Sequence, residues 1–271
     1  RTISNPDCVA VDSGGNVWVN TFQQLFKIAP DGTQTGFTPF AAQSGSAMVV
    51  DRAGNVYVVS EHDDTLHKMT PDGHWSVLAG SNLNAAVGSG LVGSGYQDGP
   101  GAQALFRMPS DLAIDDRDVI YVADSNNSAI RKVMPDGSVS TVAGKPIYQG
   151  PSPASGSPTP IPSALLANTI SPSSIALGPQ GVVYATTRDN RLVAVQVDGT
   201  VKLIAGDRVL GCEPAPCPGF CPSVAPVNCH VDAVGSAARF ARPRCMVIDH
   251  AGALYILDGE RFGDLRIRKV V

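Results

Sequence analysis

The sequence predicts an all-β protein, because one block of four strand-like runs recurs along the chain. The most regular copy extends from Arg107 to Gly144. Its runs DLAID, VIYVAD, AIRKVM and SVSTVAG are apolar or alternate in polarity, and turn-forming Asp, Gly and PDG separate them. Each run is too short for an ordinary helix. Each copy is therefore expected to form four antiparallel strands.

Five copies of the block align on the residue that ends the first strand, which is aspartate in four copies and Gly178 in the other. An aromatic residue follows at a fixed distance in every copy. These aromatic residues are Trp18, Tyr57, Tyr121, Tyr184 and Tyr255. The copies cover residues 5–43, 44–80, 107–144, 171–206 and 241–271. A regular array of small sheets is therefore predicted.

A sheet of four short strands cannot bury both faces alone, but it can do so between two similar sheets. Radial stacking of such sheets leaves only short, protected edges. The sequence therefore predicts a β-propeller of four-stranded antiparallel blades, formed as one domain over residues 1–271. The five aromatic residues are expected to pack between blades and to carry no chemistry.

Two linkers between blades share a pattern, DGPGAQALFRMP and DAVGSAARFARP. Phe106 and Phe240 stand at the same place in both and are expected to fill the groove between neighbouring blades. The unit IYVADSNNSAIRKVMPDGSVSTVAG, with DGPGAQALFRMPSDLAID before it, resembles the NHL repeat, a propeller-forming family. The resemblance extends over nearly the whole chain. It implies an NHL-type propeller of the secreted or extracellular type.

NHL propellers most often have six blades, so the five copies imply either a five-bladed ring or a six-bladed ring with one blade outside this chain. The last copy lacks a fourth strand, and residues 1–4 are expected to close it, as in propellers that resemble this one. Cys8 and Cys245 occupy the same position in the first and last copies. In a five-bladed ring they would be neighbours and form a disulfide, provided that their Cα atoms approach closely enough. Two buried free thiols are the alternative.

Three insertions interrupt the repeats, at residues 81–106, 145–170 and 207–240. The first is rich in Gly, and the second is rich in Pro and Ser and favours polyproline II. The third contains four crowded cysteines, Cys212, Cys217, Cys221 and Cys229. Disulfides are expected there, with three possible pairings, while zinc ligation is the alternative, although the spacing matches no zinc finger. Loops on a rigid scaffold are a natural place for binding.

Catalytic residues would have to converge where the first strands begin. Those positions hold a mildly polar set, without the three histidines or the Glu-Asn-Asp set of metal-dependent propeller lyases and lactonases. His62 and His67 are interpreted as solvated turn residues, and the carboxylates of DDRD at 115–118 as turn formers. No cofactor is therefore predicted, while structural calcium or zinc stays open.

Asn126 begins the N-glycosylation sequon Asn126-Asn127-Ser128 in a predicted turn and is a candidate for glycosylation. Together with the cysteines it indicates an extracellular or cell-surface location. The net charge of −4 favours neither nucleic acid nor an anionic membrane as a partner, and no apolar run reaches the roughly 20 residues needed to span a bilayer. The chain begins without a signal-like segment, as a mature fragment or an excised domain would.

The function favoured by these features is a non-catalytic extracellular module for binding or assembly, which presents its loops to a protein or glycan partner within a larger assembly. Two alternatives stay open. One is a propeller enzyme of the lyase, lactonase or strictosidine-synthase-like kind. The other is a purely structural domain of a larger cell-surface or fibrous protein.

Overall fold

The structure is a computed structural model that describes residues 3, 6–21, 24–37, 47–80, 94–144, 150–151, 170–206, 231–259 and 265–270. The chain divides into two compact units, Arg1–Pro172 and Ser173–Val271, and each unit is described by itself. The single domain over 1–271 stays a prediction.

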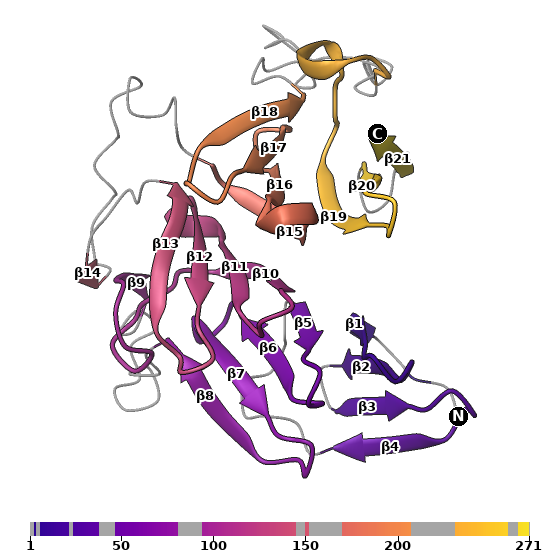
Figure 1. Ribbon diagram of the computed structural model, residues 1–271, viewed down its shortest axis with the longest axis vertical. Helices are drawn as coiled ribbons and strands as arrows, with labels where there is room; N and C mark the ends of the chain where they lie inside the picture. The colour runs from indigo at the N-terminus through magenta and orange to yellow at the C-terminus, as the bar shows by residue number, and fades with distance from the viewer. Residues whose placement is uncertain are drawn as a thin grey trace, which may run out of the picture. The chain divides into compact units, whose positions relative to one another are not determined.

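The first unit contains three four-stranded antiparallel sheets, each with its strands in chain order (Figure 1). The first sheet is β1 (Pro6–Val11), β2 (Val17–Thr21), β3 (Leu25–Ile28) and β4 (Gln34–Phe37). The second is β5 (Ala47–Val50), β6 (Val56–Ser60), β7 (Thr65–Met69) and β8 (Trp75–Ala79). The third is β10 (Pro109–Ile114), β11 (Ile120–Asp124), β12 (Ala129–Val133) and β13 (Val139–Gly144).

The second unit contains the last two sheets. Four strands form one of them, β15 (Pro172–Leu177), β16 (Val183–Thr187), β17 (Leu192–Val195) and β18 (Val201–Ala205). Three form the other among the described residues, β19 (Pro243–Ile248), β20 (Leu254–Asp258) and β21 (Arg266–Val270). The chain is thus an all-β protein with five blades of a β-propeller, as the sequence predicts. Residues 1, 2 and 4, most of the predicted closing segment, lie outside the described residues.

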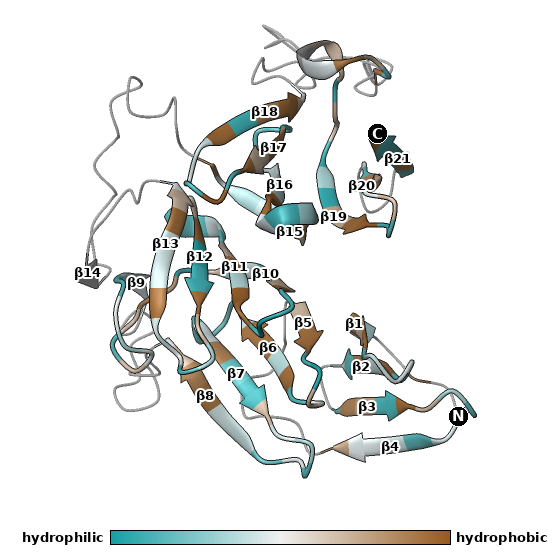
Figure 2. Cartoon of the chain, viewed as in Figure 1, coloured by the Kyte–Doolittle hydropathy of each residue, from teal (hydrophilic) through white to brown (hydrophobic). Residues whose placement is uncertain are grey.

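Apolar side chains fill the space between successive sheets of the first unit. One cluster lies between the first and second sheets and includes Trp18, Leu25 and Met69. A second cluster lies between the second and third sheets and includes Tyr57 and Phe106, with Phe106 fully buried. Figure 2 shows apolar colouring along much of β6 and β11 and hydrophilic segments within the third strands β7 and β12. Those hydrophilic segments lie in strands with largely buried side chains.

The turn aspartate and the aromatic residue of the repeat are bonded to each other in the first two sheets. Trp18 donates its Nε1–H to Asp12 Oδ2 at 3.0 Å, and Tyr57 donates its hydroxyl to Asp51 Oδ2 at 3.0 Å. Burial and the nearby Asp51 charge raise the pKa of Tyr57, so the phenol keeps its proton. In these two sheets the turn aspartate and the repeat aromatic residue are therefore joined by a polar bond in addition to the packing.

Among the described residues, two short strands lie outside the blade sheets. They are β9 (Gly95–Tyr96) and β14 (Gly150–Pro151), and they pair in antiparallel fashion, Gly150 with Tyr96 and Pro151 with Gly95. The first follows residues 81–93 and the second precedes residues 152–169. Two of the predicted insertions, 81–106 and 145–170, are therefore joined by a ladder in the first unit. The four cysteines of the third insertion lie outside the described residues, so their pairing stays a prediction.

Candidate functional site

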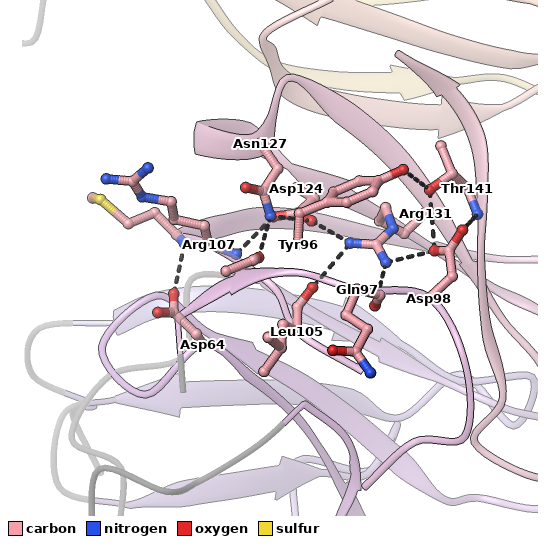
Figure 3. Close-up of polar contacts among 12 residues, drawn as sticks. Asp64, Tyr96, Gln97, Asp98, Leu105, Arg107, Asp124, Asn127, Arg131 and Thr141 are labelled. Atoms are coloured by element: carbon pink, nitrogen blue, oxygen red, sulfur yellow. Dashed lines mark hydrogen bonds and ion pairs between the residues drawn. The ribbon is translucent and has the colours of Figure 1, made fainter. Parts of the chain in front are cut away.

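The root of the first insertion is held by one buried arginine. Arg131 lies on β12 with its side chain fully buried. Its Nη1–H groups donate to Asp124 Oδ2 at 2.7 Å and to the carbonyl oxygen of Leu105 at 3.0 Å. Its Nη2–H groups donate to Asp98 Oδ1 at 2.6 Å and to the Gln97 carbonyl oxygen at 2.8 Å (Figure 3). One guanidinium therefore ties the linker before the third blade to the interior of that blade.

The guanidinium of Arg131 also lies against two aromatic rings. Its central carbon is 4.4 Å from the ring centroid of Tyr96 and 5.3 Å from that of Phe106. Such cation–π contacts stabilise a desolvated guanidinium by up to about 2 kcal/mol each. The Tyr96 hydroxyl is bonded to Thr141 Oγ1 on β13, and Asp98 also accepts the Thr141 backbone N–H. Strand β9 is thereby fixed to the outer strand of the third blade.

Asp124, at the end of β11, is the anionic partner inside the blade. Its side chain is fully buried and accepts from Arg131, from Asn127 Nδ2 at 2.8 Å and from the Arg107 backbone N–H at 2.8 Å. Asn127 donates in addition to the Gly95 carbonyl oxygen at 2.6 Å. Both ends of the linker, Gly95 and Arg107, are thus bonded to the same turn. We call Asp98, Asp124, Asn127 and Arg131 the linker clamp.

The second unit repeats most of this arrangement. Arg268 on β21 bonds Asp258 Oδ2 at 3.1 Å, Asp232 Oδ1 at 2.6 Å and the carbonyl oxygens of Arg239 and Val231. Its guanidinium lies 5.3 Å from the Phe240 ring centroid. Register explains the match, because Arg131 pairs with Val122 and Arg268 with Ile256, the residue after the repeat aromatic in each blade. A buried arginine of this kind therefore holds both linkers that share the pattern from Asp to Pro, DGPGAQALFRMP and DAVGSAARFARP.

Burial dominates the electrostatics of Asp124. Desolvation raises the pKa of its carboxyl group to about 6, although Arg131 and the hydrogen bonds from Asn127 and Arg107 act in the opposite direction. Burial likewise raises the pKa of Asp64, whose Oδ1 accepts the Met108 backbone N–H at 2.6 Å. Figure 3 shows this second carboxylate near Arg107, at the same end of the linker that is bonded to Asp124.

A pH dependence follows from the raised pKa of Asp124. Its unfolded value is about 3.9, so between about pH 4 and pH 6 the folded chain binds the extra proton. This raised pKa stabilises the folded state, and the stabilisation is fully present below about pH 4 and is lost as the pH rises through about 6. We expect the Asp124 side-chain carbon to titrate near pH 6 in ¹³C NMR, with the signal assigned through Asp124→Asn. The stability difference between wild type and Asp124→Asn should be larger at pH 4.5 than at pH 7.5. A midpoint below pH 4 would contradict this assignment.

The candidate residues of the sequence are distributed over both units. Trp18, Tyr57, Phe106 and Phe240 are buried, whereas Tyr121, Tyr184 and Tyr255 are partly exposed. Asn126 is half-buried at the turn after β11. Cys8 lies in the first unit and Cys245 in the second, so a disulfide between them stays a prediction. Cys212, Cys217, Cys221 and Cys229 lie outside the described residues.

Catalytic residues would have to converge where the first strand of each blade begins, and serine hydroxyl groups at these positions make hydrogen bonds within the protein. Ser110 Oγ lies 2.6 Å from Ser125 Oγ, Ser173 Oγ donates to the Pro243 carbonyl oxygen, and Ser174 Oγ accepts the Met246 backbone N–H. No group of three or more His, Cys, Asp or Glu side chains suited to a metal ion occurs among the described residues.

The expectation that His67 is a solvated turn residue is wrong. His67 is buried on β7, 7% exposed, with Nε2 2.7 Å from Thr65 Oγ1 and 3.1 Å from Asp63 Oδ2. It pairs with Val58, so it occupies in the second blade the position of Arg131 in the third. His62 is exposed, as expected.

Comparison with known families identifies the repeat. The family model of the NHL repeat matches residues 106–133, from the linker phenylalanine to the end of β12. This segment is an NHL repeat. It contains Asp124, Asn127 and Arg131, so three of the four clamp residues belong to the NHL repeat itself. The resemblance predicted from the sequence is confirmed.

This chain is similar to Teneurin-3 from Mus musculus, with 30% identity over 237 residues. The similarity covers 84% of this chain but 8% of Teneurin-3. The chain therefore spans less than a tenth of the length of the curated relatives it matches.

Two solved structures share the fold. Virginiamycin B lyase from Staphylococcus aureus matches 98% of this chain and 70% of its own, with a TM-score of 0.54 and 14% identity. A chain in a nidogen/laminin complex matches 93% of this chain and 72% of its own, with a TM-score of 0.56 and 12% identity. At such identities the likeness concerns the propeller fold alone. Separately, no helix within the described ranges is long and apolar enough to cross a membrane.

Proposed function

We propose that this chain is a non-catalytic, protein-binding propeller domain of a larger extracellular protein. Its binding surface would be the end of the third blade that carries the two joined insertions. The observation that carries the proposal is the ladder between β9 and β14, which brings residues from the insertions 81–106 and 145–170 together on one base. Loops that a rigid scaffold carries are a natural place for recognition of a macromolecule.

The linker clamp supports this proposal because it makes the base rigid. Tyr96 and Gly95 belong to β9, and both are bonded to the third blade, through Thr141 and Asn127 respectively. A loop root that is fixed before binding loses less conformational entropy when a partner is bound. The buried charges at the root are therefore consistent with a role in presenting loops.

The similarity to Teneurin-3 supports a domain of a longer extracellular protein. Teneurins are cell-surface proteins, and the similar region is a small part of one. An enzymatic function finds less support, because the likeness to virginiamycin B lyase is one of fold.

The test is a binding screen with a loop-shortened variant. The purified chain would be immobilised and probed, in 0.5 M NaCl to screen charge contacts, with a panel of purified extracellular ectodomains and with a glycan array. In the variant, a short Gly-Ser linker replaces residues 152–169. We expect at least one ectodomain to bind the wild type and to bind the variant at least tenfold more weakly.

The matched control is the double variant Arg52→Ala and Asp116→Ala. These residues form an exposed ion pair at 2.8 Å between the β5–β6 and β10–β11 turns, at the strand ends opposite to β9. The control should bind as the wild type does. Binding by glycans alone, or equal binding by the loop-shortened variant, would contradict the proposal.

A further inference from the structure

The turn between β11 and β12 carries the one Asn-X-Ser/Thr sequon of the whole sequence, Asn126-Asn127-Ser128. We propose that Asn126 carries an N-linked oligosaccharide at the insertion-bearing end of the third blade. The proposal concerns a modification site and does not depend on the identity of any binding partner.

In this turn the acceptor residue, Asn126, differs from its neighbours in burial. Ser125, Asn127 and Ser128 are buried, and each has a partner inside the protein. Asn127 Nδ2 donates to Asp124 and to the Gly95 carbonyl oxygen, while Ser128 Oγ lies 3.0 Å from Ser171 Oγ. Asn126 alone is half-buried, and its backbone N–H donates to the Arg107 carbonyl oxygen at 3.1 Å. The backbone of the turn is therefore held in place while the Asn126 carboxamide lies at the surface.

Met108 provides a second, independent observation. Its backbone has a φ of +47°, a conformation uncommon for a bulky residue, and its side chain is 40% exposed. Met108 Sδ lies 2.8 Å from Asn126 Nδ2. The other clamped linker has Arg242 at this position, next to a blade without a sequon. An exposed apolar side chain thus stands beside the acceptor, where the C–H face of a first sugar can pack against it.

The linkage is made to the Asn126 carboxamide, which lies at the surface, whereas the Ser128 hydroxyl of the sequon is buried in the folded protein and is accessible to the transferase before the chain folds. Asn126 Nδ2 loses one proton and forms a bond to C1 of N-acetylglucosamine. The bond between C1 and the phosphate oxygen of a lipid pyrophosphate-linked oligosaccharide breaks, and the lipid pyrophosphate leaves. The donor is the co-reactant that the secretory pathway supplies. The product amide keeps one N–H, which can still donate to Met108.

The experiment is secretion of the full chain from a eukaryotic host behind an added signal peptide. Peptide mass spectrometry should find most copies of the Asn126 peptide with a hexosamine-based glycan. Both Asn126→Gln and Ser128→Ala should remove it, whereas Asn190→Gln, in the corresponding turn of the fourth blade, should not. A secreted wild type whose Asn126 peptide is mainly unmodified would overturn the proposal.

Because Ser128 is buried and its variant could fail to fold, a second measurement uses the wild type alone. Peptide N-glycosidase treatment of the folded protein in H₂¹⁸O should convert the glycosylated Asn126 to ¹⁸O-labelled aspartate. Absence of the label at Asn126, with the enzyme active on a standard glycoprotein, would equally overturn the proposal.

Discussion

Replacing Arg131 by methionine is expected to lower the free energy of unfolding of the first unit by about 3–5 kcal/mol, the usual result of removing one partner from a buried ion pair. The variant leaves the fully buried Asp124 without its cationic partner, and it frees the Leu105 and Gln97 carbonyl oxygens. Denaturant unfolding followed by tryptophan fluorescence measures this unit, because both tryptophans of the chain, Trp18 and Trp75, lie in it.

The neighbouring lysine is the control for Arg131. Lys132→Met removes the same charge from the same strand, but Lys132 is only half-buried. This variant should therefore lower the free energy of unfolding by less than about 1 kcal/mol, as surface substitutions do. The effect of Arg131→Met should also shrink below pH 6, where Asp124 takes up a proton. A loss below about 1 kcal/mol at pH 7.5 would show that the linker is held by other contacts.

The second large effect is expected at the glycine that ends the fourth strand of a blade. Gly144 has a φ of +99°, and a Cβ built on it would lie 2.2 Å from the Ser128 carbonyl oxygen and 2.7 Å from the Ala129 Cα. Gly144→Ala should therefore lower the free energy of unfolding by about 3 kcal/mol or more, since backbone strain and overpacking each cost roughly 1–3 kcal/mol. Gly80 and Gly206 make the same close approach in their blades.

A glycine with a similar φ but open surroundings separates the cost of backbone strain from the cost of overpacking. Gly32 has a φ of +85°, and nothing lies within 4 Å of a Cβ built on it. Gly32→Ala should therefore show the strain alone, about 1 kcal/mol. Equal effects at Gly32 and Gly144 in denaturant unfolding would mean that the approach to Ser128 does not matter.

The repeat predicts the blades well because local patterns determine them. Alternation in VIYVAD, the turn PDG and the terminal Gly of SVSTVAG all correspond to strands, turns or close approaches in the structure. The linker pattern around Phe106 correctly indicates a special connection. These signals act over a few residues, and the same signals recur in each copy.

The linker clamp could not be found in the same way, because Arg131 bonds Asp98, 33 residues before it in the sequence, and Asp124 on the neighbouring strand. Asp98 and Arg131 meet only once β12 has its register, and AIRKVM reads as an ordinary strand. One signal was present, since Arg131 and Arg268 occur in the two copies whose linkers share the Asp-to-Pro pattern. The burial of His67 does not follow from the sequence for the same reason, because strand register and not the adjacent turn determines it.

The central proposal is that the two joined insertions carry the binding surface. The most direct measurement is the affinity of an ectodomain found in the screen for three proteins, the wild type, the variant shortened at residues 152–169 and the Arg52→Ala, Asp116→Ala control. We predict that shortening raises the dissociation constant at least tenfold, about 1.4 kcal/mol or more, while the control leaves it unchanged. Equal affinity of all three proteins would contradict the account.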